Sequence, residues 1–180
     1  GIPAEPLFRS ETMITDELYI GAFICFGDAE LTVACARDML GLLDEGSYDY
    51  LFTAEAKSIP LIHEMARQSG AKKYFIARKG PKAYMPDPIH VEDNSITTAG
   101  TQRLYLGRDD AELIRGKRIV LMDDVISTGG SLHAMEALVA MAGGTVVDRI
   151  AVLAEGAAAQ RTDIKFLAPL PVFNADGSVK

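Results

Sequence analysis

"RIVLMDDVISTGGSL", residues 118–132, decides the fold class of this chain. An apolar run stops on two adjacent acids, Asp123 and Asp124, and five small residues then precede a helical pattern. A buried strand, a loop and a helix produce this order. In an open parallel sheet, such a loop and the following helix N-terminus form the usual place for a ligand.

The same alternation of strand and helix continues on both sides of this stretch. The patterns predict strands at 48–53, 72–78, 118–124 and 145–155, and helices at 28–43, 59–70 and 131–144. Asp28 is a candidate N-cap, Pro60 lies in a first helical turn, and Gly70 stands where a C-cap belongs. We therefore expect an α/β fold, with a mostly parallel twisted sheet covered by helices on both faces.

Composition limits the class of protein. With 180 residues, 48% of them hydrophobic, the chain is expected to form one globular domain. A net charge of −7 argues against a non-specific nucleic-acid surface. The apolar run at 19–26 is too short to span a bilayer and the opening residues lack a signal-peptide layout, so a cytoplasmic protein without membrane contacts is expected. Cys25 and Cys35 lack metal-type neighbours and are expected to be reduced core thiols.

The loop after the acid pair has the chemistry of a phosphate cradle. Its glycines let the backbone approach an anion closely, and its hydroxyls add donors to the positive end of the next helix. The loop consists of Ser127, Thr128, Gly129, Gly130 and Ser131. Asp123 and Asp124 would repel a phosphate but suit sugar hydroxyls or a divalent cation. Ribose 5-phosphate has a phosphate and a diol at the spacing that this pattern requires.

The stretch "IVLMDDVISTGGS" resembles the phosphoribosyl-diphosphate-binding signature of the type I phosphoribosyltransferases. "FTAEAKSIPL", 52–61, is similar to the pyrophosphate loop of the adenine phosphoribosyltransferases and their relatives, and "ARKGPKAYM", 77–85, looks like the basic stretch after their next strand. The likeness covers roughly residues 48–155 and is weaker at 167–173.

This resemblance implies roles for the acid pair and the loop. Asp123 and Asp124 would hold the ribose hydroxyls, and would contact Mg²⁺ through water or those hydroxyls, while residues 127–131 would hold the 5-phosphate. The implied reaction transfers the phosphoribosyl group from phosphoribosyl diphosphate to a nitrogen of a base and releases pyrophosphate. Family members are commonly homodimers, so a homodimer is expected.

A second set of residues is expected at the diphosphate. Residues 54–58 end a strand on the sheet edge that carries the acid pair, so Lys57 and the loop amides can face a diphosphate. The expected contacts are Glu55, Ala56, Lys57, Ser58, Arg78, Lys79 and Lys82. Lys57, Arg78 and Lys79 would stabilise the leaving group together with the acid pair. The alternative for Arg78 and Lys79 is a pair of solvated charges at a strand end.

The remaining segments are assigned to a lid and a hood. Residues 79–114 break the alternation, and a long irregular insert of this kind is more often a functional loop or hairpin than filler. Residues 80–106 are therefore expected to form a flexible lid that excludes water. The N- and C-terminal segments of the single domain, 1–180, are expected to form a hood.

The base is less clearly indicated than the sugar phosphate. In the 6-oxopurine branch an Asp usually opens the phosphate loop, and Ser127 stands there, which disfavours hypoxanthine and guanine. Adenine is favoured, although Thr98-Ala99-Gly100 replaces the Glu-Tyr-Gly of adenine enzymes and "LFRSET", 7–12, only partly matches their purine-binding Phe-Arg. A xanthine-type enzyme and a sensor of phosphoribosyl diphosphate without turnover stay open as alternatives.

Several other motifs have a structural interpretation. An acid pair also marks response regulators, but there it lies on the first strand. "HEMAR", 63–67, lacks the second His of a zinc-protease helix and is interpreted as a solvated helix face. His90 and His133 are expected to be structural or on the surface. Core packing is favoured over base stacking for Phe23, Phe26 and Phe173.

Overall fold

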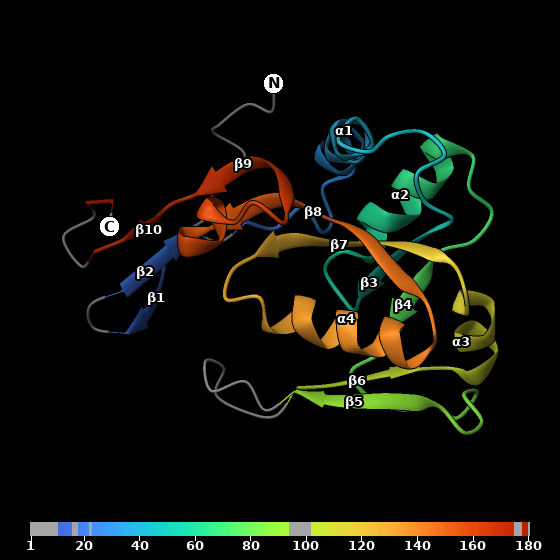
Figure 1. The fold of residues 1–180 in the computed structure, drawn as a ribbon. Helices are drawn as coiled ribbons and strands as arrows, with labels where there is room; N and C mark the ends of the chain where they lie inside the picture. The colour runs from blue at the N-terminus through green and yellow to red at the C-terminus, as the bar shows by residue number, and fades with distance from the viewer. Residues whose placement is uncertain (1–10, 16–17, 22, 94–101, 175–177, 180) are drawn as a thin grey trace.

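A five-stranded parallel sheet forms the centre of the computed structural model, which describes residues 11–15, 18–21, 23–93, 102–174 and 178–179 (Figure 1). The strand order is β4-β3-β7-β8-β9, and every neighbouring pair runs parallel. The strands are β4 (Phe75–Ala77), β3 (Tyr50–Ala54), β7 (Arg118–Ile126), β8 (Thr145–Glu155) and β9 (Lys165–Leu170). The predicted α/β fold with a mostly parallel sheet is confirmed.

Helices cover both faces of this sheet (Figure 1). Helices α1 (Ala29–Leu40) and α2 (Ile59–Ser69) lie on one face, and α4 (Gly130–Met141) lies on the other. Alternate side chains of β7 enter different layers: Val120 and Met122 pack in the cluster with α1 and α2, whereas Ile119 and Leu121 pack with α4. Full burial of each of these side chains stabilises the fold by roughly 2 kcal/mol relative to exposure.

Local signals place the helix ends. The Asp28 side chain accepts a hydrogen bond of 3.0 Å from the Leu31 N–H and caps α1. Pro60 lies in the first turn of α2, and Gly70 ends that helix with φ of 74°, a left-handed conformation that a glycine adopts without strain. These three predictions hold, and α4 begins one residue earlier than the pattern predicts.

Three features differ from the sequence prediction. Strand β7 continues to Ile126, so the acid pair lies inside the strand and not at its last residues. A fifth parallel strand, β9, was not among the predicted strands. A short helix, α3 (Arg108–Ile114), follows the hairpin of β5 (Ile89–Asp93) and β6 (Gln102–Leu106) in the segment expected to be irregular.

The hairpin packs beside α4 and is joined to the central sheet. Leu104 and Leu106 are buried in the cluster that contains α4. Arg78 and Tyr105 exchange two main-chain hydrogen bonds, of 2.8 and 2.9 Å, next to the end of β4. Residues 94–101, which include the Thr98-Ala99-Gly100 counterpart, lie outside the described residues, so the lid stays a prediction.

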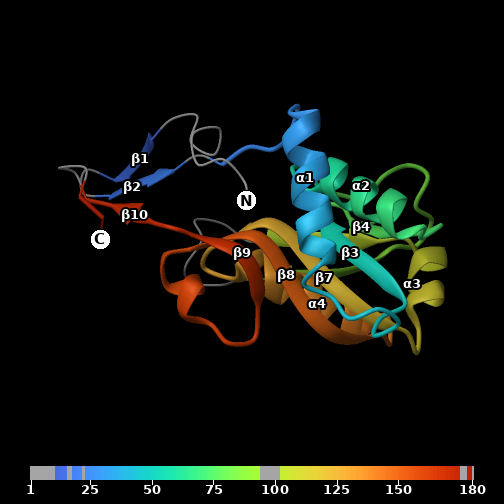
Figure 2. The same ribbon diagram turned by 90° about the horizontal axis from the view of Figure 1, so that it is seen from above.

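A second sheet brings together segments from near both ends of the chain. Strands β1 (Glu11–Thr15), β2 (Leu18–Gly21) and β10 (Val172–Phe173) pair antiparallel in the order β1-β2-β10. Figure 2 shows this small sheet to one side of the parallel sheet. The predicted purine-binding counterpart at 7–12 falls mostly outside the described residues, and the hood function of the small sheet stays a prediction.

The two cysteines are free and fully buried, as predicted for core thiols. Burial is the main cause that raises the pKa of Cys25 to about 11 and that of Cys35 to about 12, so both are protonated near neutral pH. In the part of the chain that the structure describes, no helix has the length and apolar character needed to cross a membrane.

Candidate functional site

The acid pair lies on β7, the middle strand of the sheet. Asp123 is partly exposed, whereas only 5% of Asp124 is exposed. Asp124 Oδ2 is buried and accepts no hydrogen bond from any of the residues described. The ammonium group of Lys57 lies 3.8 Å from this oxygen. A buried carboxylate oxygen without a donor is costly, so this atom is suited to receive a donor or a cation from a ligand.

Ser58 connects the loop after β3 with the acid pair. Its hydroxyl donates to Asp123 Oδ1 at 2.8 Å and accepts the Asp124 N–H at 2.9 Å. The Asp124 N–H also lies 2.9 Å from Asp123 Oδ1. Since only 1% of Ser58 is exposed, its hydroxyl does not face solvent and is hydrogen-bonded to the acid pair.

The pKa of Asp123 is raised to about 7. Burial is the largest cause, and the negative charge of Asp124 is the next. The hydrogen bond from Ser58 acts in the opposite direction because it stabilises the carboxylate. Two adjacent negative charges in this protected site therefore repel each other. A cation or hydroxyl donors from a ligand would reduce that repulsion.

A hollow of about 110 Å³ lies against Asp123, between β7 and the start of α4. It is lined by Asp123, Val125, Ile126, Ser127, Thr128, Gly129, Gly130, Ser131 and Leu132. All five residues of the predicted phosphate loop thus line one hollow together with one of the acids. Gly129 has φ of 87° and precedes the first residue of α4, so the helix N-terminus opens at this hollow.

Arg161 also lies at this loop, and sequence reasoning did not find it. A Cβ atom on Gly129 would lie 2.9 Å from Arg161 Nη1. The other guanidinium nitrogens of Arg161 are held by Asp163, at 2.9 Å from Nε to Oδ1 and 2.6 Å from Nη2 to Oδ2. The position of Arg161 depends on the path of the loop between β8 and β9, and no motif in the sequence marks it.

The predicted diphosphate residues are brought only partly together. Lys57 reaches the acid pair, whereas Arg78 Nε forms an ion pair of 2.9 Å with Glu55 Oε2 without hydrogen-bond geometry. Glu55 Oε1 accepts the Lys79 N–H at 2.6 Å, so Glu55 joins the ends of β3 and β4. Lys79 is exposed and Lys82 is half-exposed. Ala56 follows Glu55 through a cis peptide bond.

Arg78 also lines a larger cavity of about 300 Å³, on the side of β4 that faces α3. The cavity is lined by Tyr74, Ile76, Arg78, Tyr84, Met85, Pro86, Gly107, Arg108, Asp109 and Asp110. Its cations and carboxylates are largely paired: Arg108 contacts Asp87 at 2.5 Å, and Asp110 contacts Lys73 at 2.8 Å. The two hollows have different linings, and only the smaller one contains an acid of the pair.

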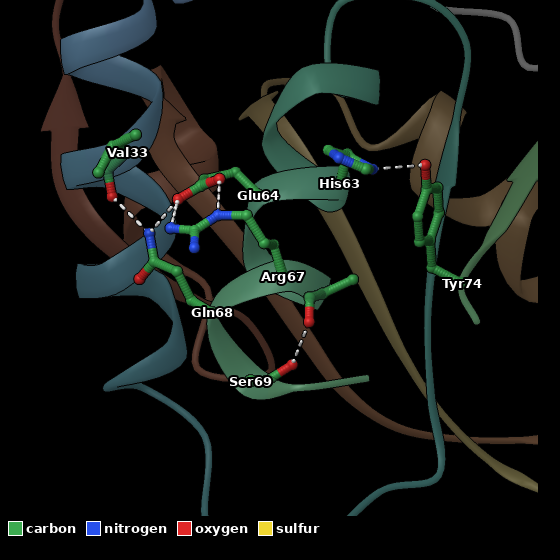
Figure 3. A network of polar contacts seen from close by, with 8 residues as sticks. Val33, His63, Glu64, Arg67, Gln68, Ser69 and Tyr74 are labelled. Atoms are coloured by element: carbon green, nitrogen blue, oxygen red, sulfur yellow. Dashed lines mark hydrogen bonds and ion pairs between the residues drawn. The ribbon is translucent and has the colours of Figure 1, made fainter. Parts of the chain in front are cut away.

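The helix face at 63–67 forms a polar network at the surface, as expected for a solvated helix face (Figure 3). Glu64 forms an ion pair of 2.8 Å with Arg67, and His63 Nδ1 lies 3.2 Å from the Tyr74 hydroxyl. Gln68 donates to Glu64 and to the Val33 carbonyl, which joins α2 to α1. The described residues contain no group of three or more His, Cys, Asp or Glu side chains arranged to hold a metal.

The remaining predicted residues have different environments. His90 and His133 are exposed, which confirms a surface position for both. Phe23 is buried in the core, as expected, whereas 54% of Phe26 is exposed, so the core prediction is wrong for that residue. Phe173 is half-buried in β10.

Comparisons with known proteins agree with this geometry. The phosphoribosyl transferase domain matches residues 30–173. An adenine phosphoribosyltransferase of Mycobacterium avium is 41% identical over 95 residues, which cover 53% of this chain and 49% of that protein. A hypoxanthine/guanine phosphoribosyltransferase of Methanotorris igneus is 29% identical over 114 residues, covering 63% of this chain and 58% of that protein.

The fold is also found among solved structures. The crystal structure of an adenine phosphoribosyltransferase from Thermoanaerobacter pseudethanolicus superposes with a TM-score of 0.65 at 24% identity, covering 79% of this chain and 82% of that one. In sequence, the matched part of the chain spans about half the length of the M. avium relative.

Proposed function

We propose, from the premise that this chain belongs to the phosphoribosyl transferase domain family, that it transfers a phosphoribosyl group from phosphoribosyl diphosphate to a ring nitrogen of a purine. The products would be a nucleoside monophosphate and pyrophosphate. The observation that carries the proposal is the hollow that Asp123 and the whole loop 127–131 line. The next residue of β7, Asp124, has a buried oxygen that accepts no hydrogen bond from the residues described.

The two ends of this hollow suit the two ends of a ribose 5-phosphate. The α4 N-terminus and the loop hydroxyls would bind the phosphate, and the acid pair would accept hydrogen bonds from the ribose diol. Lys57, 3.8 Å from Asp124 Oδ2 and 62% exposed, can reach both the acid pair and a diphosphate on C1. Positive charge held beside the leaving oxygens lowers the barrier to C1–O cleavage.

The acid pair also fits a divalent cation of the Mg²⁺ class. Mg²⁺ usually binds proteins through one or two carboxylates and completes its coordination with water and substrate oxygens. Asp123 and Asp124 supply such a pair. The Oδ2 of Asp124, which accepts no hydrogen bond from the residues described, is an oxygen that a cation or its water could contact. When bound, Mg²⁺ would supply positive charge to the diphosphate as it leaves.

Adenine is the base that we favour. The relative from M. avium is named an adenine phosphoribosyltransferase, and the matched loop of this chain begins with Ser127 in place of the Asp of the 6-oxopurine branch. A 6-oxopurine stays the competing substrate class, since a relative from M. igneus carries a hypoxanthine/guanine name.

The cellular setting belongs to the same proposal. We place the enzyme in purine salvage, in the cytoplasm and as a homodimer, with phosphoribosyl diphosphate and a small base as its partners. A lid formed by part of residues 80–106 would exclude water from the cationic sugar. The net charge of −7 argues against a non-specific nucleic-acid partner.

A base panel tests the proposal. The purified protein is mixed with phosphoribosyl diphosphate, Mg²⁺ and adenine, hypoxanthine, guanine, xanthine, orotate or uracil, and pyrophosphate release is measured. We expect the highest kcat/KM with adenine. Release with xanthine alone would move the assignment to a xanthine-type enzyme. If no base gives pyrophosphate release while calorimetry shows tight binding of phosphoribosyl diphosphate, the proposed enzymatic activity is refuted and a sensor is favoured.

A further inference from the structure

Ser58 occupies the position of a helix cap but does not act as one. It directly precedes α2, where serine commonly accepts a hydrogen bond from a backbone N–H of the first helical turn. Here the Ser58 side chain makes no such bond to α2. Its hydroxyl lies instead between the two acids of β7, in hydrogen bonds of 2.8 and 2.9 Å.

The Ser58 hydroxyl holds one oxygen of Asp123 and thereby restricts the orientation of its carboxylate. Asp123 Oδ1 accepts both the Ser58 hydroxyl and the Asp124 N–H, at 2.8 and 2.9 Å. Asp123 also lines the hollow of the phosphate loop. With Oδ1 held from the loop side, rotation of the carboxylate is restricted, and its remaining hydrogen-bonding capacity is available to the hollow.

We propose that Ser58 is a positioning residue that sets the Asp123 carboxylate for the ribose diol and does not itself bind the diphosphate. The inference rests on the proposed function, since it assumes a ribose phosphate in the hollow. Its 1% exposure argues against direct contact with a bound diphosphate, although Lys57 beside it is largely exposed. Ser58 thereby connects the loop that carries Lys57 with the diol end of the site.

The chain provides a matched control in Thr53. Its hydroxyl is also fully buried and also links the β3 side to β7, through a 2.7 Å hydrogen bond to the Met122 carbonyl. Thr53→Val removes a hydroxyl of similar burial at nearly constant volume, without touching a carboxylate. If Ser58→Ala loses more ribose 5-phosphate affinity than Thr53→Val does, the extra loss therefore reflects the contact with Asp123. It does not reflect the hydrogen bonding between β3 and β7.

The test separates three roles for Ser58 by ligand. Ribose 5-phosphate and Mg²⁺-pyrophosphate are each titrated into wild type, Ser58→Ala, Ser58→Thr and Thr53→Val by calorimetry, after thermal unfolding has confirmed that each variant is folded. For Ser58→Ala we expect ribose 5-phosphate to bind about tenfold more weakly, the scale of one lost hydrogen bond to a charged group. Pyrophosphate binding should change less than twofold, and Ser58→Thr should restore the ribose 5-phosphate affinity.

The other outcomes would reject either the positioning role of Ser58 or the proposed function. Weaker pyrophosphate binding with unchanged ribose 5-phosphate binding would make Ser58 a direct diphosphate contact and reject the positioning role. Equal losses in Ser58→Ala and Thr53→Val, or no loss in Ser58→Ala, would reduce Ser58 to a structural residue. If wild type binds no ribose 5-phosphate at all, the proposed function fails and the inference fails with it, which the wild-type titration alone reveals.

Discussion

Asp123→Asn should remove a pH-dependent loss of stability from the ligand-free protein. The pKa of Asp123 is raised from its ordinary 3.8 to about 7, first by burial and then by the charge of Asp124. The folded protein therefore holds this proton more tightly than the unfolded chain does. Because of that difference, the free energy of unfolding falls as the pH rises from about 4 to about 7, and the loss is complete above the folded pKa.

The size of the effect follows from the shift. One pKa unit corresponds to about 1.4 kcal/mol, so a shift of about three units sets an upper limit of about 4 kcal/mol. Because Asp123 is partly exposed and solvent screens its interactions, we expect a net difference of about 2 kcal/mol between wild type and variant on going from about pH 5 to about pH 8. Asn keeps an oxygen that can accept the Ser58 hydroxyl, so the local packing is preserved.

Urea unfolding in EDTA measures this difference, because EDTA removes cations that would neutralise the pair. The pKa values of Asp49, Glu64 and Asp163 are lowered to about 2, mainly by hydrogen bonds from arginines, so these acids titrate below the window and affect both proteins equally. Asp123→Asn should gain stability over wild type as the pH rises. Parallel curves for the two proteins would refute the argument that burial and repulsion strain this carboxylate.

Three further predictions concern the loop, the lysine and the cation. Gly129→Ala should lower the free energy of unfolding by about 1–2 kcal/mol because of the left-handed φ, should displace Arg161, and should weaken ribose 5-phosphate binding. The control is Gly46→Ala, where φ is 75° and a Cβ atom would meet open space. Equal stability losses in the two variants would exclude a role for the Arg161 contact. Lys57→Ala should weaken Mg²⁺-pyrophosphate binding by about tenfold, the scale of a lost charge-assisted contact, and ribose 5-phosphate binding by much less; equal losses by calorimetry would contradict its diphosphate role. EDTA should abolish pyrophosphate release and added Mg²⁺ should restore it, whereas full activity in EDTA would remove the cation from the proposal.

The central sheet was largely predictable because its strands are short apolar runs between helical patterns. Strands β3, β7 and β8 are buried between two helix layers, and their sequences show this directly. Strand β9 escaped prediction because it lies at a sheet edge, carries Pro169 and is only partly buried. Helix α3 has only seven residues and no side-chain cap, so its pattern is too short to stand out.

The part of the site that was predictable from the sequence consists of residues in one continuous motif. The acid pair and the phosphate loop occupy one stretch of β7 and α4, and the structure places them around one hollow. The position of Ser58 against Asp123 joins residues 65 positions apart, so no local pattern encodes it. The sequence predicted Ser58 at the diphosphate because the stretch 52–61 resembles a pyrophosphate loop. Its hydrogen bonds to Asp123 and Asp124 depend on tertiary packing.

The pairing of β10 with β2 has a consequence for how the protein matures on the ribosome. The strands β3, β4, β7, β8 and β9 are all synthesised before Val172 and Phe173, so the parallel sheet can assemble while the nascent chain still lacks β10. Strands β1 and β2 can pair earlier, but β2 gains its second neighbour only when β10 emerges. A chain stalled shortly before Val172 would thus expose one edge of β2, where another chain could pair with it.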